Sequence, residues 1–340
     1  MLDLAIAGGG PVGLATALYA ARAGLEVVVF EPRAGAIDKA CGEGLMPGAV
    51  AALSGIGVQP DGLTLQGIRY LAGTWCAEAQ FRSGAGRGVR RTTLHAALRD
   101  KVDAAGVLVV PEAVTAISQT DSSVQVNGTQ SRYLVAADGL HSPTRRELGL
   151  DAPVKTGRRF GLRSHVEIEP WTDFVEVHWS PRAEAYVTPV APGLVGLALL
   201  TSARGSFEEQ LRNFPELSER VAGSSMSPVK GAGPLRQRSR RRTAGRVLLA
   251  GDASGYVDAL TGEGIAVGLA QAKAAVAAVV ADDPRRYERS WRRASWRYQV
   301  ITHTLLAVAG VPPARRALVP LASRLPMVFS AAVNELGRPA

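Results

Sequence analysis

The spacing of hydrophobic residues changes along this chain, and the change predicts two kinds of sheet. The first 30 residues contain an apolar run at 2–7, a helical pattern at 12–23 and a β-branched run at 25–30. A strand, a glycine turn, a helix and a second strand form a right-handed βαβ unit, which belongs to a parallel sheet. Further strands are expected at 107–110, 113–118, 123–126, 132–137 and 246–250, and helices at 91–105, 206–222 and 263–281.

The middle of the chain follows a different pattern. Apolar and polar residues alternate at 174–179, and turn-forming residues separate this segment from apolar runs at 184–190 and 194–200. A period of two predicts antiparallel strands with one buried face. The fold class is therefore α/β, with an antiparallel-sheet domain inserted into a Rossmann-like domain. The predicted boundaries are 1–156 with 236–285 for the first domain, 157–235 for the insertion and 286–340 for a C-terminal helical segment.

Composition narrows the class of protein. Hydrophobic residues make up 46% of the 340 residues and charged residues 20%, which is typical of a globular chain and excludes a disordered one. Cys41 and Cys76 are too few for a disulfide scaffold, and the five histidines lack metal-ligand spacing, so we predict no metal site. The sequence shows no secretory leader pattern and no apolar run of membrane-spanning length, and we expect a cytoplasmic protein.

The formal net charge of +9 bears on partners rather than on fold. No basic stretch carries a nucleic-acid-binding motif, so no nucleic-acid partner is expected. Six arginines between positions 285 and 297 alternate with Tyr287, Trp291 and Trp296. Two interpretations stay open: a helix at a membrane surface, or a helix packed on the first domain with an exposed basic face, which we favour. The prolines at 312, 313, 320 and 326 are expected to break or shorten the helices there.

The glycine turn after the first strand carries the first chemical signal. Residues 8–13 read Gly-Gly-Gly-Pro-Val-Gly, which fits the GxGxxG pattern between a strand and a helix. Gly8 permits the tight turn, Gly10 lets the backbone approach a pyrophosphate, and Gly13 lets helix and strand pack closely. Glu31 ends the next strand, where a carboxylate accepts hydrogen bonds from ribose hydroxyls and repels a 2′-phosphate. This context predicts a dinucleotide site.

Two later stretches indicate which dinucleotide binds. Residues 133–146 read YLVAADGLHSPTRR, and residues 246–271 read RVLLAGDASGYVDALTGEGIAVGLAQ. Together with the glycine turn, residues 1–285 resemble the FAD-dependent monooxygenases of the aromatic-hydroxylase type and the related geranylgeranyl reductases. The resemblance implies a Rossmann-like FAD-binding domain with an inserted substrate domain, and FAD as cofactor with NAD(P)H as reductant.

The same resemblance implies a set of cofactor contacts. Arg91 resembles the family arginine that contacts FAD, although Arg90 beside it leaves the choice ambiguous. Val114 falls where a family strand offers its backbone to adenine, and Asp252 is best placed for a ribityl hydroxyl. The full implied set is Gly8, Gly10, Pro11, Val12, Gly13, Glu31, Pro32, Arg33, Lys39, Gly42, Gly44, Leu45, Arg91, Val114, Asp138, Gly139, Gly251, Asp252, Gly262, Gly264 and Ile265.

Candidate catalytic residues lie in the loop expected at 33–48. Residues 38–45 read DKACGEGL, which resembles the loop beside the flavin in geranylgeranyl reductases. Cys41 is then a candidate substrate-facing group and Glu43 a candidate proton relay; the alternative for Cys41 is a small buried hydrophobe. On the antiparallel sheet, Tyr186, Thr188 and Pro189 are candidates for the substrate pocket, with core packing as the alternative.

The favoured function is that of an NAD(P)H-dependent FAD monooxygenase, which hydroxylates or epoxidises an aromatic, polyketide or other apolar small molecule. The alternative is a geranylgeranyl reductase-like flavoprotein that reduces isoprenoid double bonds. A flavin-binding scaffold or sensor is the non-enzymatic hypothesis. The sequence leaves the substrate and the oligomeric state open.

Overall fold

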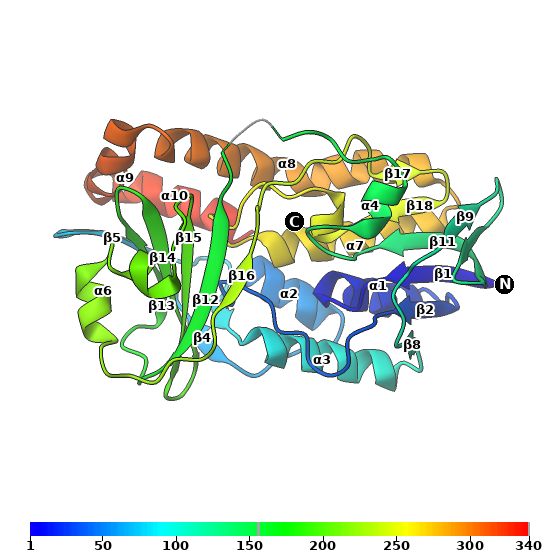
Figure 1. Cartoon of the computed structure of the whole chain (residues 1–340), viewed down its shortest axis with the longest axis horizontal. Coiled ribbons are helices and arrows are strands. Elements are labelled where there is room, and N and C mark those ends of the chain that lie inside the picture. Colours follow the sequence, from blue (N-terminus) through cyan, green and yellow to red (C-terminus); the bar gives the residue numbers. More distant parts are fainter. Residues whose placement is uncertain (155–156, 339–340) are drawn as a thin grey trace.

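The computed structural model describes residues 1–154 and 157–338. The molecule is elongated, with two large sheets side by side along its length and a helical layer over both (Figure 1). This arrangement confirms the predicted α/β class. The predicted domain boundary at residue 156 and the last two residues of the C-terminal segment lie outside the described residues.

The first sheet has a parallel centre, as the opening βαβ pattern predicts. Its strand order is β17-β18-β11-β1-β2-β8, and β10 pairs with β11 and β9 at one edge. Strand β1 pairs in parallel with both β2 and β11, and β18 continues the sheet beyond β11. The strands are β1 (Leu2–Ala7), β2 (Val27–Phe30), β8 (Leu108–Val110), β9 (Ile117–Gln119), β10 (Val124–Val126), β11 (Thr129–Ala136), β17 (Thr243–Ala244) and β18 (Val247–Leu249).

Three helices pack on this sheet and close its core. They are α1 (Pro11–Arg22), α3 (Arg91–Ala104) and α7 (Gly264–Val280). Helix α1 begins at Pro11, whose fixed φ suits the first helical position. Leu4 and Leu14 are at most 1% exposed and belong to the same apolar cluster as Leu269 of α7. Two short elements follow strand ends at the cavity side: α4 (Pro143–Glu147) and the 3-10 turn η1 (Gly251–Ser254).

The second sheet is mainly antiparallel, but it also contains two strands from an earlier part of the chain than predicted. Its order is β16-β12-β15-β14-β13-β5-β6. Strands β5 and β6 come from the range assigned to the first domain, and β5 pairs in parallel with β13, so the boundaries of 157–235 for the inserted sheet are wrong. The strands are β5 (Gly67–Ala72), β6 (Trp75–Gln80), β12 (Phe160–Glu167), β13 (Phe174–Trp179), β14 (Ala183–Ala191), β15 (Leu194–Thr201) and β16 (Lys230–Ala232).

A small third sheet and three short helices complete this part of the fold. The sheet has the order β3-β7-β4, with β3 (Gly44–Leu45), β4 (Leu63–Leu65) and β7 (Gly86–Gly88), and α2 (Pro47–Gly55) follows β3. The single helix predicted at 206–222 is wrong, because Pro215 starts a new helix. The two helices are α5 (Phe207–Leu211), whose N-terminus is capped by Ser206, and α6 (Pro215–Arg220).

The C-terminal segment forms three helices, each beginning at a proline: α8 (Pro284–Ala309), α9 (Pro312–Arg324) and α10 (Pro326–Leu336). Pro320 lies inside α9 and does not shorten it, contrary to expectation. Helix α8 buries Tyr287, Trp291 and Tyr298 against the first sheet's helices and η1 and runs along the long axis (Figure 1). No single helix of the described chain is long and apolar enough to cross a bilayer; α8 and α9 together meet that test but join at a bend of 115°.

Candidate active site

A cavity of about 460 Å³ lies between the two large sheets. Its walls are the turns after β1, β11 and β18, the loop before β3, the starts of α3 and α7, and strands of the second sheet. The predicted residues that line it are Gly10, Pro11, Val12, Arg33, Lys39, Cys41, Gly42, Glu43, Gly44, Leu45, Arg91, Asp138, Gly139, Tyr186, Gly251, Asp252, Gly262, Gly264 and Ile265. The predicted residues outside the lining are Gly8, Gly13, Glu31, Pro32, Val114, Thr188 and Pro189.

The glycines of the first turn have different roles. A Cβ atom on Gly13 would lie 1.8 Å from Gly8 O, and Gly8 itself has a φ of 100°. Gly10 has an ordinary φ of −71°, and a Cβ atom there would have Arg91 Nη2 as its nearest neighbour, at 3.8 Å. Gly8 and Gly13 therefore serve turn geometry and packing, whereas Gly10 keeps the cavity wall clear beside Arg91.

Glu31 follows β2 and is buried as a hydrogen-bonded anion. Its Oε2 accepts from Gly9 N at 2.8 Å, and its Oε1 accepts from Arg33 N at 3.0 Å. Two further hydrogen bonds of 2.7 Å come from the Arg33 guanidinium. Burial opposes ionisation, but these donors outweigh it and lower the pKa of Glu31. The carboxylate fixes the glycine turn, and its contact with a ribose stays a prediction.

Three cations, Arg33, Lys39 and Arg91, line the cavity near this turn. Burial lowers the pKa of Lys39 and of Arg91, and the charge of Arg33 adds to both shifts. Arg91 Nε is buried and finds no hydrogen-bond partner among the described residues. A phosphate group would satisfy that donor and relieve the repulsion, so the residues present fit the pyrophosphate of a dinucleotide. The lining contains Arg91 and not Arg90, which favours Arg91 as the predicted cofactor contact.

Two carboxylates border the same cavity beyond the ends of β11 and β18. Asp138 Oδ2 accepts from Thr144 N at 3.0 Å, while its Oδ1 is buried without a partner in the described chain. Burial raises the pKa of Asp252, and the charges of Lys39 and Arg91 oppose that shift. The buried, unpaired Oδ1 of Asp138 suits a hydroxyl group of a ribose or ribityl chain.

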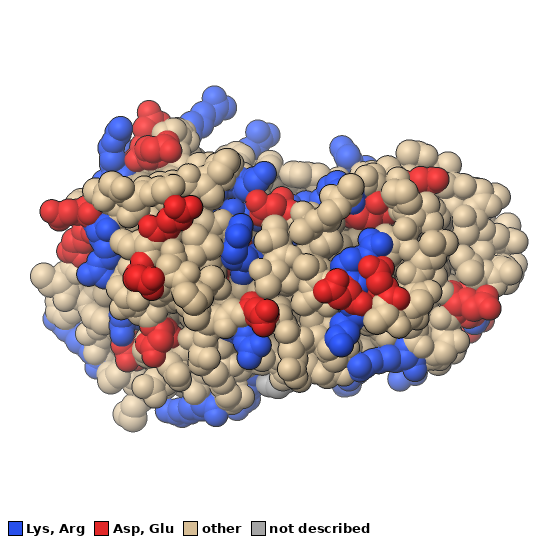
Figure 2. All heavy atoms as spheres, turned by 90° about the horizontal axis from the view of Figure 1, so that it is seen from below, with Lys and Arg blue, Asp and Glu red and all other residues tan. Residues whose placement is uncertain are grey.

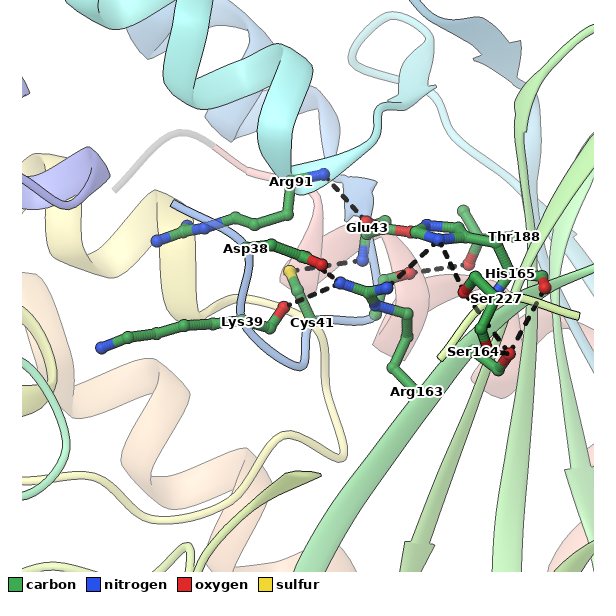
Figure 3. A network of polar contacts seen from close by, with 11 residues as sticks. Asp38, Lys39, Cys41, Glu43, Arg91, Arg163, Ser164, His165, Thr188 and Ser227 are labelled. Carbon is green, nitrogen blue, oxygen red and sulfur yellow. Dashed lines mark hydrogen bonds and ion pairs between the residues drawn. The ribbon is translucent and has the colours of Figure 1, made fainter. Parts of the chain in front are cut away.

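The loop before β3 is fastened to the second sheet by a chain of polar contacts (Figure 3). His165 Nε2 on β12 lies 2.7 Å from Glu43 Oε2, and Arg163 Nη1 lies 3.1 Å from His165 Nδ1. Arg163 also pairs with Asp38 and donates to Lys39 O at 3.3 Å. The sequence alone did not indicate Arg163 or His165 as parts of the site.

These donors define the tautomer of His165. Arginine has no acceptor, so Arg163 donates to Nδ1 and the imidazole proton resides on Nε2. Nε2–H then donates to Glu43, whose other oxygen accepts from Arg91 N at 2.8 Å. Glu43 is 3% exposed and has a φ of 59°, a conformation that costs a non-glycine residue roughly 1–2 kcal/mol. The geometry makes Glu43 a fixed acceptor that anchors the loop; its role as a proton relay stays a prediction.

Cys41 lines the cavity next to this anchor. Its Sγ accepts a hydrogen bond from Glu43 N at 3.4 Å. Burial raises the pKa of the Cys41 thiol; Arg91 opposes the shift and the Glu43 carboxylate reinforces it. The thiol therefore keeps its proton at neutral pH, which makes it a weak nucleophile and a proton donor.

The second sheet gives the cavity an apolar wall. Tyr186 belongs to it and donates its hydroxyl to Leu260 O at 2.9 Å. Thr188 and Pro189 do not line the cavity. Thr188 Oγ1 instead donates to Gly42 O at 2.8 Å, and β7 crosses so closely that a Cβ atom on Gly88 would lie 1.7 Å from Pro189 O. The apolar wall consists of Ile68, Tyr70, Val175, Val177, Tyr186, Ala198, Leu200 and Leu235.

The strand expected at 113–118 is wrong. Val114 does not lie on a strand, and its contact with adenine stays a prediction. Strand β9 begins only at Ile117, and Val114 packs against the apolar core below the first sheet. The side chain of Asn127 accepts from Thr115 N at 3.0 Å and from Ala116 N at 3.3 Å. These bonds replace strand pairing here, as asparagine side chains commonly do in turns.

Glu263 at the start of α7 gives the site a measurable pH signature. It is 7% exposed with one unpartnered carboxyl oxygen, and burial raises its pKa from 4.5 to about 8. Between these values the folded protein keeps a proton that the unfolded chain has lost, so stability falls as pH rises. We expect Glu263→Gln to remove that loss, which is on the order of 5 kcal/mol at alkaline pH because each pKa unit corresponds to about 1.4 kcal/mol.

Thermal unfolding checks this prediction. Wild type and Glu263→Gln should unfold at similar temperatures near about pH 5, and the variant should be more stable near about pH 9. The exposed Glu219→Gln is the control and should follow wild type at both values. Equal alkaline stability of Glu263→Gln and wild type would contradict a buried, protonated Glu263.

The fold, and the cationic hydrogen-bond donors Arg33, Lys39 and Arg91 in the cavity, are those of a flavin-dependent oxidoreductase site. The family model of the FAD binding domain matches residues 1–193, and the chain belongs to that family. Its cofactor is accordingly FAD. The chain is 28% identical to menaquinone reductase of Mycobacterium tuberculosis over 329 residues, 85% of this chain and 78% of the relative.

Two further comparisons match this chain to proteins whose names indicate other activities. The chain is 28% identical to para-nitrophenol 4-monooxygenase of Pseudomonas sp. over 324 residues, 81% of this chain and 77% of the relative. A solved structure of a geranylgeranyl bacteriochlorophyll reductase-like protein from Thermoplasma acidophilum has a TM-score of 0.79 at 18% identity, covering 98% of this chain and 95% of the other. The chain is thus an oxidoreductase with both reductase and monooxygenase relatives.

Proposed function

We propose that this protein is a FAD-dependent reductase that hydrogenates a carbon–carbon double bond of an apolar, isoprenoid-type substrate. The observation that carries the proposal is the position of the Cys41 thiol in the wall of a cavity that is charged on one side and apolar on the other. The menaquinone reductase and geranylgeranyl reductase-like relatives support this choice.

Reduction of a double bond needs a hydride at one carbon and a proton at the other. Bound FAD supplies the hydride once a donor such as NAD(P)H has reduced it. Arg33, Lys39 and Arg91 would hold the pyrophosphate. The Cys41 S–H gives its proton to the second carbon, and the thiolate regains a proton from solvent. The negative charge of Glu43 disfavours that thiolate and so favours the return of the proton.

Monooxygenation, the function that the sequence favours, is the second candidate, supported by the para-nitrophenol 4-monooxygenase relative. It requires activated oxygen in the same cavity. A cysteine in the wall would be exposed to that oxidant and would be converted to sulfenic or sulfinic acid over repeated turnovers. This chemical conflict is the reason to place the reductase first.

Product analysis distinguishes the two functions. The holoenzyme with NAD(P)H, or with dithionite as reductant, is mixed with menaquinone carrying an unsaturated side chain, and products are identified by mass spectrometry. A reductase adds two hydrogens without oxygen, whereas a monooxygenase adds one oxygen atom that comes from labelled O₂. Incorporation of labelled oxygen would overturn the proposal.

Substitution of the thiol tests its role as proton donor. We expect Cys41→Ala to slow substrate reduction by about 10²–10³-fold, the range typical of a lost general acid, with unchanged FAD content. The exposed Cys76→Ala should behave as wild type. A full rate in Cys41→Ala would remove Cys41 from the mechanism.

A further inference from the structure

A second cavity, of about 610 Å³, lies between residues 236–242, the turn η1 and the helices α7 and α8. It borders the cofactor site, because the two cavities share the wall residues Gly251, Asp252, Tyr256 and Gly264. The proposed reaction uses no side chain from segment 236–242. We call this space the arginine cavity, because four arginines line it: Arg236, Arg238, Arg240 and Arg242.

The local sequence places these arginines on one side of an extended segment. Residues 236–242 read RQRSRRR, so an arginine stands at every second position. Gln237 and Ser239 between them are held by the fold: Gln237 Oε1 accepts from Arg145 Nη2 at 3.2 Å, and Ser239 is 8% exposed. Alternate residues of an extended chain point to opposite sides, which directs the intervening arginine side chains together.

The side chain of Arg242 carries an unpaired donor. Its guanidinium lies 3.8 Å from the centroid of the Trp291 ring, and its Nε is buried without a hydrogen-bond partner in the described chain. Burial lowers the pKa of Arg242; Glu288 opposes that shift, and the charges of Arg292 and Arg238 add to it. A buried guanidinium with an unused donor and like charges beside it is stabilised by an anion.

The charges in the lining are almost all positive. Asp252 is the one carboxylate that the described residues contribute, and burial raises its pKa, which disfavours its charged form. Two of the arginines contact neutral acceptors: Arg236 Nη2 lies 3.1 Å from His303 Nε2, and Arg238 Nη1 donates to Pro153 O at 3.4 Å. On the face opposite the C-terminal layer, acidic and basic residues are interspersed instead (Figure 2). The arginine cavity thus has an excess of positive charge that its lining does not neutralise.

We propose that the arginine cavity binds a small molecule that carries at least two phosphate groups. A guanidinium donates two parallel hydrogen bonds to phosphate oxygens. One phosphate group cannot reach all four arginines, because positions 236 and 240 are roughly 13 Å apart along an extended chain. The concave shape suits a small molecule rather than a membrane surface or a nucleic acid duplex. The proposal concerns this cavity alone, so it and the proposed reaction can fail independently.

Isothermal titration calorimetry of the FAD-loaded protein with inorganic pyrophosphate tests the proposal. Bound FAD keeps this probe out of the first cavity, where Arg33, Lys39 and Arg91 would otherwise compete for it. We expect one pyrophosphate to bind per chain, with an affinity that falls as salt rises. Titrations with NADP⁺ and NAD⁺ identify the source of the phosphates. Tighter binding of NADP⁺ would indicate a dinucleotide whose 2′-phosphate enters the cavity, whereas weak binding of both would indicate a free pyrophosphate-type ligand.

Two sets of variants locate the bound pyrophosphate. Arg238→Ser with Arg240→Ser removes two exposed side chains of the lining and should weaken binding at least about tenfold. Arg242→Lys keeps the charge but loses the planar fork of donors, and it should also weaken binding. The control, Arg204→Ser with Arg212→Ser, changes the net charge equally at two exposed positions outside the lining and should bind as wild type does. Thermal unfolding without ligand checks that each variant folds.

Four results would overturn the proposal. The first is absence of pyrophosphate binding by the FAD-loaded wild type. The second is equal affinity of the wild type and of Arg238→Ser with Arg240→Ser. The third is an equal loss of affinity in the control, which would reduce the effect to net charge. The fourth is binding of citrate as tightly as pyrophosphate, which would assign the arginine cavity to polycarboxylates.

Discussion

Gly10→Ala is expected to abolish tight FAD binding and leave the fold intact. The backbone at position 10 is ordinary, and the new methyl group would have no neighbour within 3.8 Å in the unliganded protein. That methyl group would instead occupy the approach of the backbone to a pyrophosphate beside Arg91. We expect a loss of at least about 100-fold in FAD affinity, roughly 2.7 kcal/mol of binding free energy.

Titration of deflavinated protein with FAD, followed by flavin fluorescence, measures this effect, and circular dichroism reports the fold. Gly55→Ala on the surface of α2 has nothing within 4 Å of its new Cβ atom and should match wild type in both. Gly13→Ala should instead lower the stability of the fold, because its Cβ atom would collide with Gly8 O. Wild-type affinity in Gly10→Ala would mean that the phosphates do not lie at this turn.

Glu43→Ala is expected to lower the free energy of unfolding by about 3–5 kcal/mol, the usual result of removing one partner from a buried polar pair. His165 Nε2–H and Arg91 N–H would both lose their acceptor in a buried place. The loop that carries Cys41 would also lose one of its attachments to β12. The loss of stability should therefore be accompanied by weaker FAD binding.

Urea unfolding of Glu43→Ala, His165→Ala and the double variant gives the coupling between the two side chains. We expect a coupling free energy of at least about 1 kcal/mol, as is usual for residues in one network. Glu78→Ala is the control, because Glu78 pairs with Arg69 at the surface and such pairs contribute less than about 1 kcal/mol. Additive effects of the Glu43 and His165 substitutions would contradict the anchor.

The centre of the first sheet could be predicted because its strands β1, β2 and β18 are largely buried on both faces and appear as continuous apolar runs. Strand β1 lies between β2 and β11 in this way. Strands β5 and β6 could not be assigned to the second sheet from the sequence. Strand β5 pairs with β13, and the paired residues Gly67 and Phe174 are about 107 positions apart. A local pattern indicates that a strand forms, and it does not indicate which distant strand becomes its neighbour.

The same limit applies to the site. The glycine turn and the two aspartates after β11 and β18 were found because each motif is contiguous. The contact between Glu43 and His165 joins residues 122 positions apart. The only local signal was on β12, where Arg163 and His165 stand at alternating positions and so share one face of the strand. That signal indicates a buried polar face but does not name its partner in the loop.

The cavity has a consequence for how the protein acquires its cofactor. Its walls combine Gly10 with Gly264 and Ile265, which are synthesised about 250 residues later. A nascent polypeptide carries the glycine turn early, but the binding site does not exist until α7 has emerged and folded against α1. FAD is therefore taken up late in synthesis or afterwards, and chains that terminate before α7 remain without flavin.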